Sequence, residues 1–227
     1  MKLPFMPETW SMFLPAFFAG VGLLLASGHW DNPVLGFLGV AVLVVAALIL
    51  NFFRDFERQP ESEPGPKEVI SPADGKVVVL KEATEKFYLK KPSVHIAIFM
   101  NPLNNHVQRA PYDGKVVKKI YHPGEFLAAY DDKADLVNEQ AHLVVDLKTG
   151  GKKPKSAGKI VLKQIAGFLC RRVKTTPGEG ETIRRGERIG RILLGSRVDL
   201  FLPKSFKPRV KLGDQVRAGV TVIGELK

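Results

Sequence analysis

The dipeptide Gly195-Ser196 has the residue types needed to cut its own chain. Glycine lets the backbone bend so that the serine hydroxyl reaches the preceding carbonyl, and a glycine carbonyl is the least hindered one to attack. In a strained geometry, Ser196 Oγ converts the amide into an ester. β-Elimination then frees residues 1–195, and the dehydroalanine at position 196 hydrolyses to pyruvoyl and ammonia. Gly-Ser is a common dipeptide, so its surroundings must decide whether this chemistry applies.

Two other polar residues stand among short apolar runs. Asp74 precedes Gly75, and an aspartate in that position is by itself typical of a turn. His106 is a single histidine between predicted strands, where histidines are more often structural than catalytic. The residues alone therefore leave both roles open for each side chain. No role is assigned to the other histidines, which are His29, His95, His122 and His142.

Four segments resemble the phosphatidylserine decarboxylase family, in its short bacterial and archaeal branch. The stretch around Ser196, residues 194–203 (LGSRVDLFLP), is similar to that family near its self-cleavage site. Residues 164–167 (QIAG) and 171–173 (RRV) precede it as they do in the family. The other segments are residues 51–55 (NFFRD), 71–75 (SPADG) and 98–111 (IFMNPLNNHVQRAP). Together these segments cover most of residues 51–205.

The resemblance implies roles for four residues. Ser196 matches the residue that becomes the pyruvoyl group, and Gly195 matches the residue left at the other new chain end. Asp74 matches the aspartate that assists self-cleavage, either by orienting a base or by accepting a proton. His106 matches the first histidine of the family's histidine-containing loop.

Arg109 departs from the longer branch of the family, which has a second histidine at this position. Arginine stays protonated and cannot act as a general base. Either His106 then serves both self-cleavage and turnover, or Asp74 works without a second imidazole. Arg109 is a candidate to bind the phosphate or carboxylate of the substrate, and a surface salt bridge is the alternative.

The family chemistry implied by the resemblance is decarboxylation of phosphatidylserine to phosphatidylethanolamine. The pyruvoyl ketone forms a Schiff base with the serine amino group, and its carbonyl accepts the electrons released with carbon dioxide. His106 is the candidate that returns a proton to the substrate. The pyruvoyl group derived from Ser196 is the expected cofactor, and no metal is expected.

The expected partners are an anionic phospholipid, the membrane, and the two cleavage products, 1–195 and 196–227, as a heterodimer. The sequence leaves open whether the lipid is a diacyl lipid or an archaeal ether analogue.

The residues after the linker predict a mainly β domain. Six runs rich in Val and Ile are separated by Gly, Pro and Asp turns. They are residues 77–80, 94–99, 116–120, 143–147, 160–165 and 220–223. We expect a compact β-sandwich or barrel-like domain with hairpin repeats.

Two pairs of segments echo each other in sequence. Residues 72–78 (PADGKVV) resemble 111–117 (PYDGKVV), and 180–186 resemble 213–219. Because Asp-Gly suits a tight hairpin, the copy at Asp113 and the later pair are interpreted as hairpin turns.

The N-terminal region predicts a transmembrane helical hairpin. Residues 12–27 and 33–53 are apolar, and the second stretch is long enough to span ~30 Å of hydrocarbon. Arg54, Arg58 and Lys67 follow the second stretch, whereas the connecting turn has no Lys or Arg. This bias predicts a cell-membrane protein with its catalytic domain on the cytoplasmic face. The expected organisation is an anchor at 1–53, a linker at 54–68 and a decarboxylase domain at 69–227, cut between 195 and 196.

Nearly all of the charged residues lie in the part of the chain that follows the apolar region. All but one of the 34 Lys and Arg residues and all but two of the 23 Asp and Glu residues lie after residue 53, and the net charge is +11. A basic surface beside a membrane favours anionic headgroups. No nucleic-acid-binding motif accompanies the charge, so nucleic acid is not an expected partner. Cys170, the single cysteine, is expected to be a small buried residue.

Two other functions stay open at this point. The glycine-rich turns and Lys133 resemble biotinyl or lipoyl carrier modules, although in those modules the turns flank the lysine. Such a chain would be a carrier or membrane adaptor. An uncleaved, inactive family member acting as a scaffold is the other alternative.

Overall fold

The computed structural model describes residues 5–6, 9–58, 63–127, 137–148, 156–167, 173–192 and 196–227. It divides the chain into two compact units, Met1–Glu57 and Arg58–Lys227. The strands of the second unit are β1 (Glu68–Ile70), β2 (Gly75–Glu85), β3 (Lys91–Met100), β4 (Val107–Arg109), β5 (Gly114–His122), β6 (Gln140–Lys148), β7 (Ser156–Ile165), β8 (Val173–Thr175), β9 (Thr182–Ile183), β10 (Arg188–Ile192), β11 (Ser196–Pro203), β12 (Lys207–Pro208), β13 (Gln215–Val216) and β14 (Val222–Glu225).

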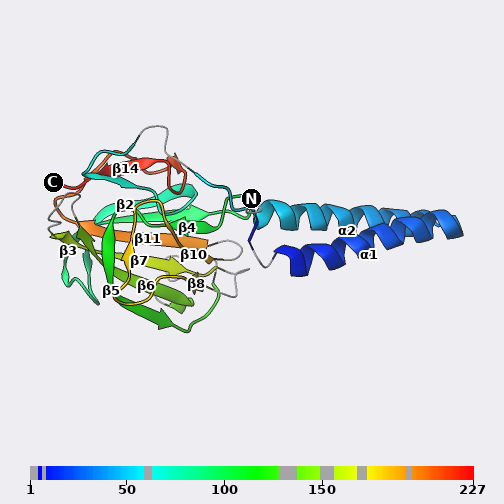
Figure 1. Cartoon of the computed structure of the whole chain (residues 1–227), viewed down its shortest axis with the longest axis horizontal. Helices are drawn as coiled ribbons and strands as arrows, with labels where there is room; N and C mark the ends of the chain where they lie inside the picture. The colour runs from blue at the N-terminus through cyan, green and yellow to red at the C-terminus, as the bar shows by residue number, and fades with distance from the viewer. Residues whose placement is uncertain are drawn as a thin grey trace. The chain divides into compact units, whose positions relative to one another are not determined.

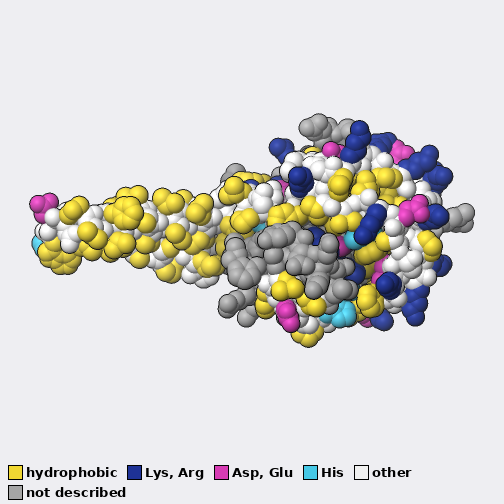
Figure 2. Space-filling view, turned by 180° about the vertical axis from the view of Figure 1, so that it is seen from behind, with side chains coloured by type: hydrophobic (Ala, Val, Ile, Leu, Met, Phe, Trp, Pro, Cys, Tyr) yellow, Lys and Arg dark blue, Asp and Glu magenta, His cyan; other side chains and the backbone are white. Residues whose placement is uncertain are grey.

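The first unit is a hairpin of two apolar helices, α1 (Thr9–Trp30) and α2 (Pro33–Phe52). Asn32 caps α2, since its side-chain oxygen accepts a hydrogen bond from Val34 N at 3.0 Å. The helices approach closely at Gly39, where an added Cβ would lie 3.0 Å from the Gly20 carbonyl oxygen. Both are long and apolar enough to cross a membrane. Hydrophobic side chains cover the visible face of the hairpin in Figure 2, and the predicted helical hairpin is confirmed.

The second unit is built on an eight-stranded antiparallel sheet with the order β13-β2-β3-β11-β7-β6-β5-β9. The sheet is curled, and two smaller sheets, β1-β14-β12 and β4-β10-β8, complete the unit (Figure 1). The predicted mainly β, barrel-like fold is confirmed. Each of the six predicted apolar runs overlaps a strand, because β-branched residues suit a pleated surface.

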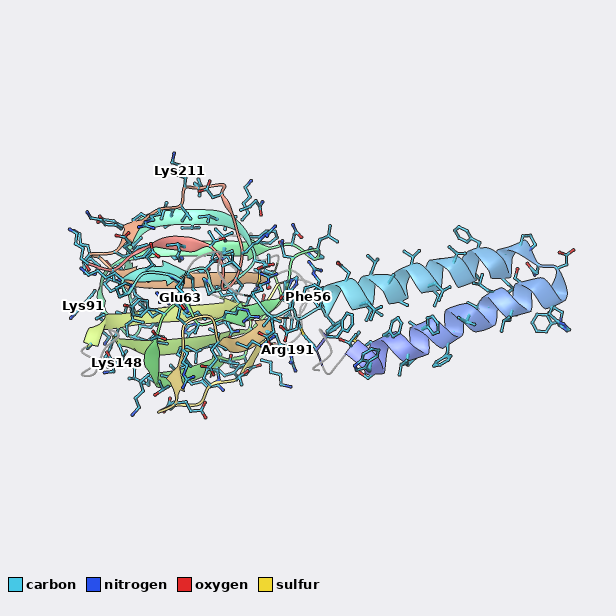
Figure 3. The ribbon with its side chains drawn as sticks, turned by 45° about the horizontal axis from the view of Figure 1, so that its top comes forward. Phe56, Glu63, Lys91, Lys148, Arg191 and Lys211 are labelled. Carbon is cyan, nitrogen blue, oxygen red and sulfur yellow. The ribbon has the colours of Figure 1, made fainter. Side chains whose placement is uncertain are left out.

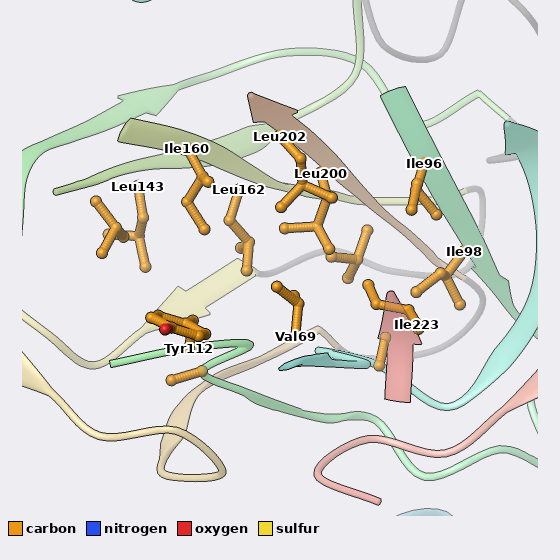
Figure 4. Packing of buried hydrophobic residues seen from close by; sticks show 14 of the residues in the cluster. Val69, Ile96, Ile98, Tyr112, Leu143, Ile160, Leu162, Leu200, Leu202 and Ile223 are labelled. Atoms are coloured by element: carbon orange, nitrogen blue, oxygen red, sulfur yellow. The ribbon is translucent and has the colours of Figure 1, made fainter. Parts of the chain in front are cut away.

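The concave face of the large sheet holds the main hydrophobic core. Central strands contribute alternate residues to it, as period-2 geometry requires, for example Val198, Leu200 and Leu202 of β11. Val69 of β1 and Ile223 of β14 belong to the same cluster, so the small sheet covers this face (Figure 4). Burial of this cluster supplies the main stabilisation of the unit.

The opposite face of the same strands carries a buried polar cluster. Asp199 accepts hydrogen bonds from Arg197 Nε at 2.7 Å and from His95 Nε2 at 2.8 Å. Burial alone would raise the pKa of Asp199, but the hydrogen bonds and the Arg197 charge hold it below its usual value. The His95 ring stacks on Phe201, with 4.3 Å between ring centroids. The central strands are therefore buried on both faces, which explains why they contain few exposed polar positions.

The sequence echoes form a structural repeat. The half β13-β2-β3-β11 matches the half β9-β5-β6-β7, so the sheet order is nearly symmetric about the β11–β7 pair. In the sheet register, Gly75 pairs with Val216 in the first half, and Gly114 pairs with Ile183 at the same place in the second. A backbone hydrogen bond is repeated in the same way: Val77 N donates to Asp214 O, and Val116 N donates to Glu181 O. The interpretation of Asp113 as a hairpin turn is wrong, because β4, which precedes it, pairs with β10 and not with β5. The later pair does not close hairpins either, because β9 pairs with β5 and β13 pairs with β2.

The repeat also places two aspartates in equivalent positions. Asp74 Oδ1 accepts a hydrogen bond from Ala218 N, and Asp113 Oδ1 accepts one from Arg185 N, both at 2.8 Å. On the partner strands, Ser196 pairs with Met100, whereas Leu147 pairs with Gly158. Gly158 thus occupies the position in the second half that corresponds to Ser196 in the first.

A first prediction concerns His142, on the polar face. Burial, and then the charge of Lys163 and the proximity of His122, lower the pKa of His142 from 6.5 to about 3. Between pH 6.5 and about 3, His142 is protonated in the unfolded chain but not in the folded chain. The resulting stability is therefore complete above pH 6.5 and is lost as the pH falls toward 3.

We expect the free energy of unfolding to fall with a slope of up to about 1.4 kcal/mol per pH unit in that window from this group alone. The measurement is denaturant unfolding at a series of pH values, for wild type and His142→Asn. The variant should show a shallower pH dependence, since all other groups remain. Parallel curves would contradict the prediction.

Candidate functional site

Ser196 is the first residue of β11 and lies at one end of the large sheet. It is fully buried, and its Oγ has no hydrogen-bond partner in the described part of the chain. A buried hydroxyl normally has a partner, so such an orphan points to strain or chemistry. An oxygen without a competing hydrogen bond is free to attack, which fits a residue that is converted into a prosthetic group. Gly195 lies outside the described residues.

His106 lies next to β4 and is fully buried. Its Nδ1 is 2.9 Å from the Asn104 carbonyl oxygen, which can only accept. Nδ1 is therefore the donor, and in the neutral ring Nε2 carries the lone pair. Nε2 is the nitrogen of His106 that can accept or return a proton.

Backbone contacts connect His106 with the two ends of the segment that precedes Ser196. Ile192 N donates to the His106 carbonyl oxygen at 3.3 Å, and Ser196 pairs with Met100. Four residue steps separate Ile192 from Ser196, a reach of at most about 14 Å. The structure therefore brings His106 into the neighbourhood of Ser196. Arg191 marks this end of the sheet in Figure 3, opposite Lys91 and Lys148.

The side chain of Gln108 holds the His106 loop against β3. Its Nε2 is 2.9 Å from the His106 carbonyl oxygen and 3.6 Å from Met100 Sδ, so it links the histidine loop with the strand that pairs with Ser196. Its Oε1 accepts from Gln164 Nε2 at 3.0 Å, and Gln164 Oε1 accepts from Thr175 at 2.5 Å. These side chains form a satisfied buried network, which makes the floor of the site rigid.

Asp74 precedes β2 and is held by two groups. Arg58 binds both of its carboxylate oxygens, with Nη2 to Oδ2 at 2.9 Å, and Ala218 N donates to Oδ1 at 2.8 Å. Since these are its partners among the described residues, Asp74 is not bonded directly to His106. Both charges are largely buried, with 10% of the Asp74 side chain and 17% of the Arg58 side chain exposed. The two hydrogen bonds from the Arg58 guanidinium fix the orientation of the Asp74 carboxylate.

The sheet register places Asp74 at the same end as Ser196. Lys76, Phe99 and Arg197 form one row across β2, β3 and β11. Strand β3 thus lies between Asp74 and Ser196, and two interstrand spacings are about 10 Å. Gly75 is needed at this point because its φ is +147° and an added Cβ would lie 2.0 Å from the Phe99 carbonyl oxygen.

Arg109 is buried rather than displayed on the surface, with 4% of the residue exposed. Its Nη1 donates to the Gly186 carbonyl oxygen at 2.8 Å, and its backbone N donates to Pro72 O at 2.9 Å. Arg109 therefore connects β4 with the turn after β9. Its substrate-binding role remains a prediction.

Two residues of the site were not found from sequence. Arg58 was interpreted only as a charge flanking the membrane segment, and its partner Asp74 is sixteen positions away. Gln108 was part of a matched motif without a role of its own. No local sequence signal indicates the role of Arg58, because its contact joins a linker residue to a turn that is distant in the chain. Lys133 of the carrier alternative lies outside the described residues, and so does Cys170.

The comparisons with known proteins identify the family of the chain. Residues 45–224 match the family model described as phosphatidylserine decarboxylase. The chain therefore belongs to the phosphatidylserine decarboxylase family, and it is a decarboxylase, a lyase.

Three bacterial relatives carry the name phosphatidylserine decarboxylase proenzyme. The protein from Magnetococcus marinus is 39% identical, with 93% of this chain and 91% of the relative covered. That from Desulfotalea psychrophila is 38% identical, with 90% of each chain covered. That from Geotalea uraniireducens is 40% identical, with 89% of this chain and 96% of the relative covered.

A second prediction follows from the Arg58–Asp74 pair. If Asp74 assists self-cleavage, Arg58→Gln should slow it about tenfold, because a lost charged hydrogen bond costs about 1.5–3 kcal/mol and leaves the carboxylate free to turn. The measurement is the rate at which uncut chain disappears on a denaturing gel. Arg54→Gln is the matched control, since Arg54 bonds to Asn51 instead. Equal rates for Arg58→Gln and wild type would contradict the prediction.

Proposed function

We propose that this chain decarboxylates phosphatidylserine to phosphatidylethanolamine with a pyruvoyl group made by self-cleavage between Gly195 and Ser196. The observation that carries the proposal is the fully buried Ser196 hydroxyl without a partner in the described part of the chain. The relatives named phosphatidylserine decarboxylase proenzyme support the substrate, and the word proenzyme supports a processing step.

Self-cleavage begins at Ser196. Oγ attacks the Gly195 carbonyl carbon, the peptide C–N bond breaks, and an ester with a free amine at residue 196 replaces the amide. Loss of the α-proton of residue 196 and cleavage of its Cβ–Oγ bond release residues 1–195 as a carboxylate. Water then replaces the nitrogen at position 196, giving pyruvoyl and ammonia. A group that removes the Ser196 proton accelerates the first step, and Asp74 and His106 are the candidates.

In turnover, the residues of this chain bind the substrate and move one proton. A pyruvoyl carbonyl at position 196 supplies the electron sink for the departing carboxylate. His106 Nε2, whose lone pair is set by the bond from Nδ1 to Asn104 O, returns a proton to the substrate carbon. Arg109 is proposed to help bind an anionic group of the substrate.

The two cleavage products are proposed to remain together as a heterodimer. Strand β11 pairs with β3 on one edge and with β7 on the other, and both of those strands lie in residues 1–195. The later strands β13 and β14 pair with β2 and β1. Fragment 196–227 is therefore joined to the larger fragment by several ladders and by a shared core.

The apolar helices are consistent with membrane association, and we propose that residues 1–53 anchor the decarboxylase domain of residues 69–227 through a linker at 54–68, on the cytoplasmic face. Arg54, Arg58 and Lys67 follow α2, and the turn between the helices has no Lys or Arg, which supports that orientation. Lys and Arg side chains are spread over the visible surface of the β unit (Figure 2), where they attract anionic headgroups.

The proposal predicts that Ser196→Ala stays a single chain. Without Oγ there is no internal nucleophile, so neither fragment nor pyruvoyl group forms. Intact mass spectrometry of the wild type should give a C-terminal fragment that begins with pyruvoyl at position 196 and resists Edman sequencing. Active wild-type enzyme consisting only of uncut chain would refute the proposal.

His106→Ala is predicted to mature, although slowly, and to decarboxylate at least about a hundredfold more slowly per mature chain. Self-cleavage is intramolecular and can tolerate the loss of one imidazole. Turnover needs a proton on every cycle, a contribution of about 10²–10⁴ in rate. Fragment yield and carbon dioxide release are measured on the same preparation.

Asp74→Asn provides the contrast, because it should accumulate uncut chain. Normal turnover per mature chain in His106→Ala would exclude His106 as the proton donor. Complete failure of His106→Ala to cleave would instead mean that His106 serves both self-cleavage and turnover.

A further inference from the structure

A pocket lies on the polar face of the large sheet, away from the face on which Ser196 lies. Its volume is about 230 Å³, below the ~300–1,000 Å³ of typical sites for drug-sized ligands. The floor is polar and includes Gln140, His142 and Lys163, and the rim includes Phe87, Pro123 and Val137. The size suits an ion or a headgroup.

Lys163 is the unusual residue of this pocket. It belongs to the interior of β7, with only 4% of the residue exposed. Its Nζ lies 5.1 Å from the Phe201 ring centroid and 5.4 Å from that of Phe87. Among the described residues, no carboxylate forms an ion pair with it.

Asp199 is the carboxylate opposite Lys163 in the sheet, and it is already bound elsewhere. Arg197 donates to both of its oxygens, at 2.7 and 3.0 Å, and His95 Nε2 donates to one of them at 2.8 Å. Asp199 is thus bonded to Arg197 and His95 and not to Lys163. Lys163 is left without a carboxylate partner among the described residues.

The histidines of the pocket and the neighbouring Tyr88 hydrogen-bond to one another and to Gln140. His142 Nε2 donates to Gln140 Oε1 at 2.6 Å, so in the neutral ring Nδ1 accepts from the Tyr88 hydroxyl at 3.1 Å. The same hydroxyl then accepts from His122 Nε2 at 3.1 Å. The pKa of His142, lowered chiefly by burial, keeps the ring neutral at neutral pH. None of these groups supplies a negative charge to Lys163.

The energy balance favours an anion beside Lys163. Burying an ammonium without a counterion is costly. The two cation–π contacts, with Phe201 and Phe87, return only part of that cost. We propose that this pocket binds a phosphate-type oxyanion, with Lys163 as its counterion. This inference is independent of the decarboxylation proposed above.

The same oxyanion can come from free phosphate or from an anionic phospholipid headgroup. The exposed Phe87 at the rim, 60% of which faces solvent, offers an apolar surface to the chains of a lipid. Binding of a soluble short-chain phosphatidylglycerol at least tenfold more tightly than inorganic phosphate would identify the lipid as the source. Equal affinities would identify the free ion.

The test is calorimetric titration of the full chain in an uncharged maltoside detergent. The probes are inorganic phosphate and dihexanoyl phosphatidylglycerol below its micelle concentration. We expect Lys163→Met, which keeps an unbranched side chain one atom shorter and removes the charge, to weaken binding at least tenfold. Lys159→Met is the matched control, since Lys159 lies on the same strand and points to the same side but does not line the pocket. It should change the affinity less than twofold.

Three results would overturn the proposal. They are absence of binding to wild type, equal binding by Lys163→Met and wild type, and equal weakening by the Lys159→Met control. If Lys163→Met does not fold, the wild type still provides the answer through the His142 ring signals in NMR. An anion beside Lys163 offsets the charge that helps to lower the pKa of His142, so phosphate should raise that pKa, and an unchanged value would contradict the proposal.

Discussion

The pairing of β11 with neighbours on both edges fixes the geometry of this protein more than any other interaction. β3 and β7 hold its backbone along its length, and the core holds its alternate side chains. Ser196, at the first position of this strand, can therefore not move to satisfy its hydroxyl. The position of the histidine loop depends on the same ladder, because the loop leaves the end of β3 at the residue that pairs with Ser196. The reactivity proposed for Ser196 would thus depend on the sheet as much as on the residue.

The internal repeat shows which additions turn a scaffold into a site. Both halves have an aspartate that accepts a backbone hydrogen bond in the same place, so that bond belongs to the architecture. Only Asp74 also has a guanidinium across both oxygens, and only the half with Asp74 has a serine where the other half has Gly158. The second half supports β11, the strand that begins with Ser196, through the β7–β11 pairing.

Several features followed from local patterns. Long uncharged stretches predicted α1 and α2, and runs of β-branched residues predicted the central strands, because burial in lipid or in a two-layer core dictates composition directly. Ser196, His106 and Asp74 came from motif resemblance, which identified the family but not the contacts. The Arg58–Asp74 pair could not be predicted, since it joins a linker to a turn across space. The polar face around Lys163 could not be predicted either. Strands that are buried on both sides lack the alternation of apolar and polar residues that shows which side faces solvent.

The central position of β11 would also change what stability means if the bond before Ser196 is cut as proposed. An uncut chain unfolds in a unimolecular step and can refold by itself. A cut chain unfolds into two molecules, so its folded fraction depends on concentration by mass action. If the larger fragment stays in a bilayer while the smaller one is free to diffuse, each complete opening becomes an irreversible loss, because the small fragment carries the reactive group away. The lifetime of the mature protein would then be set by the rate of opening rather than by an equilibrium.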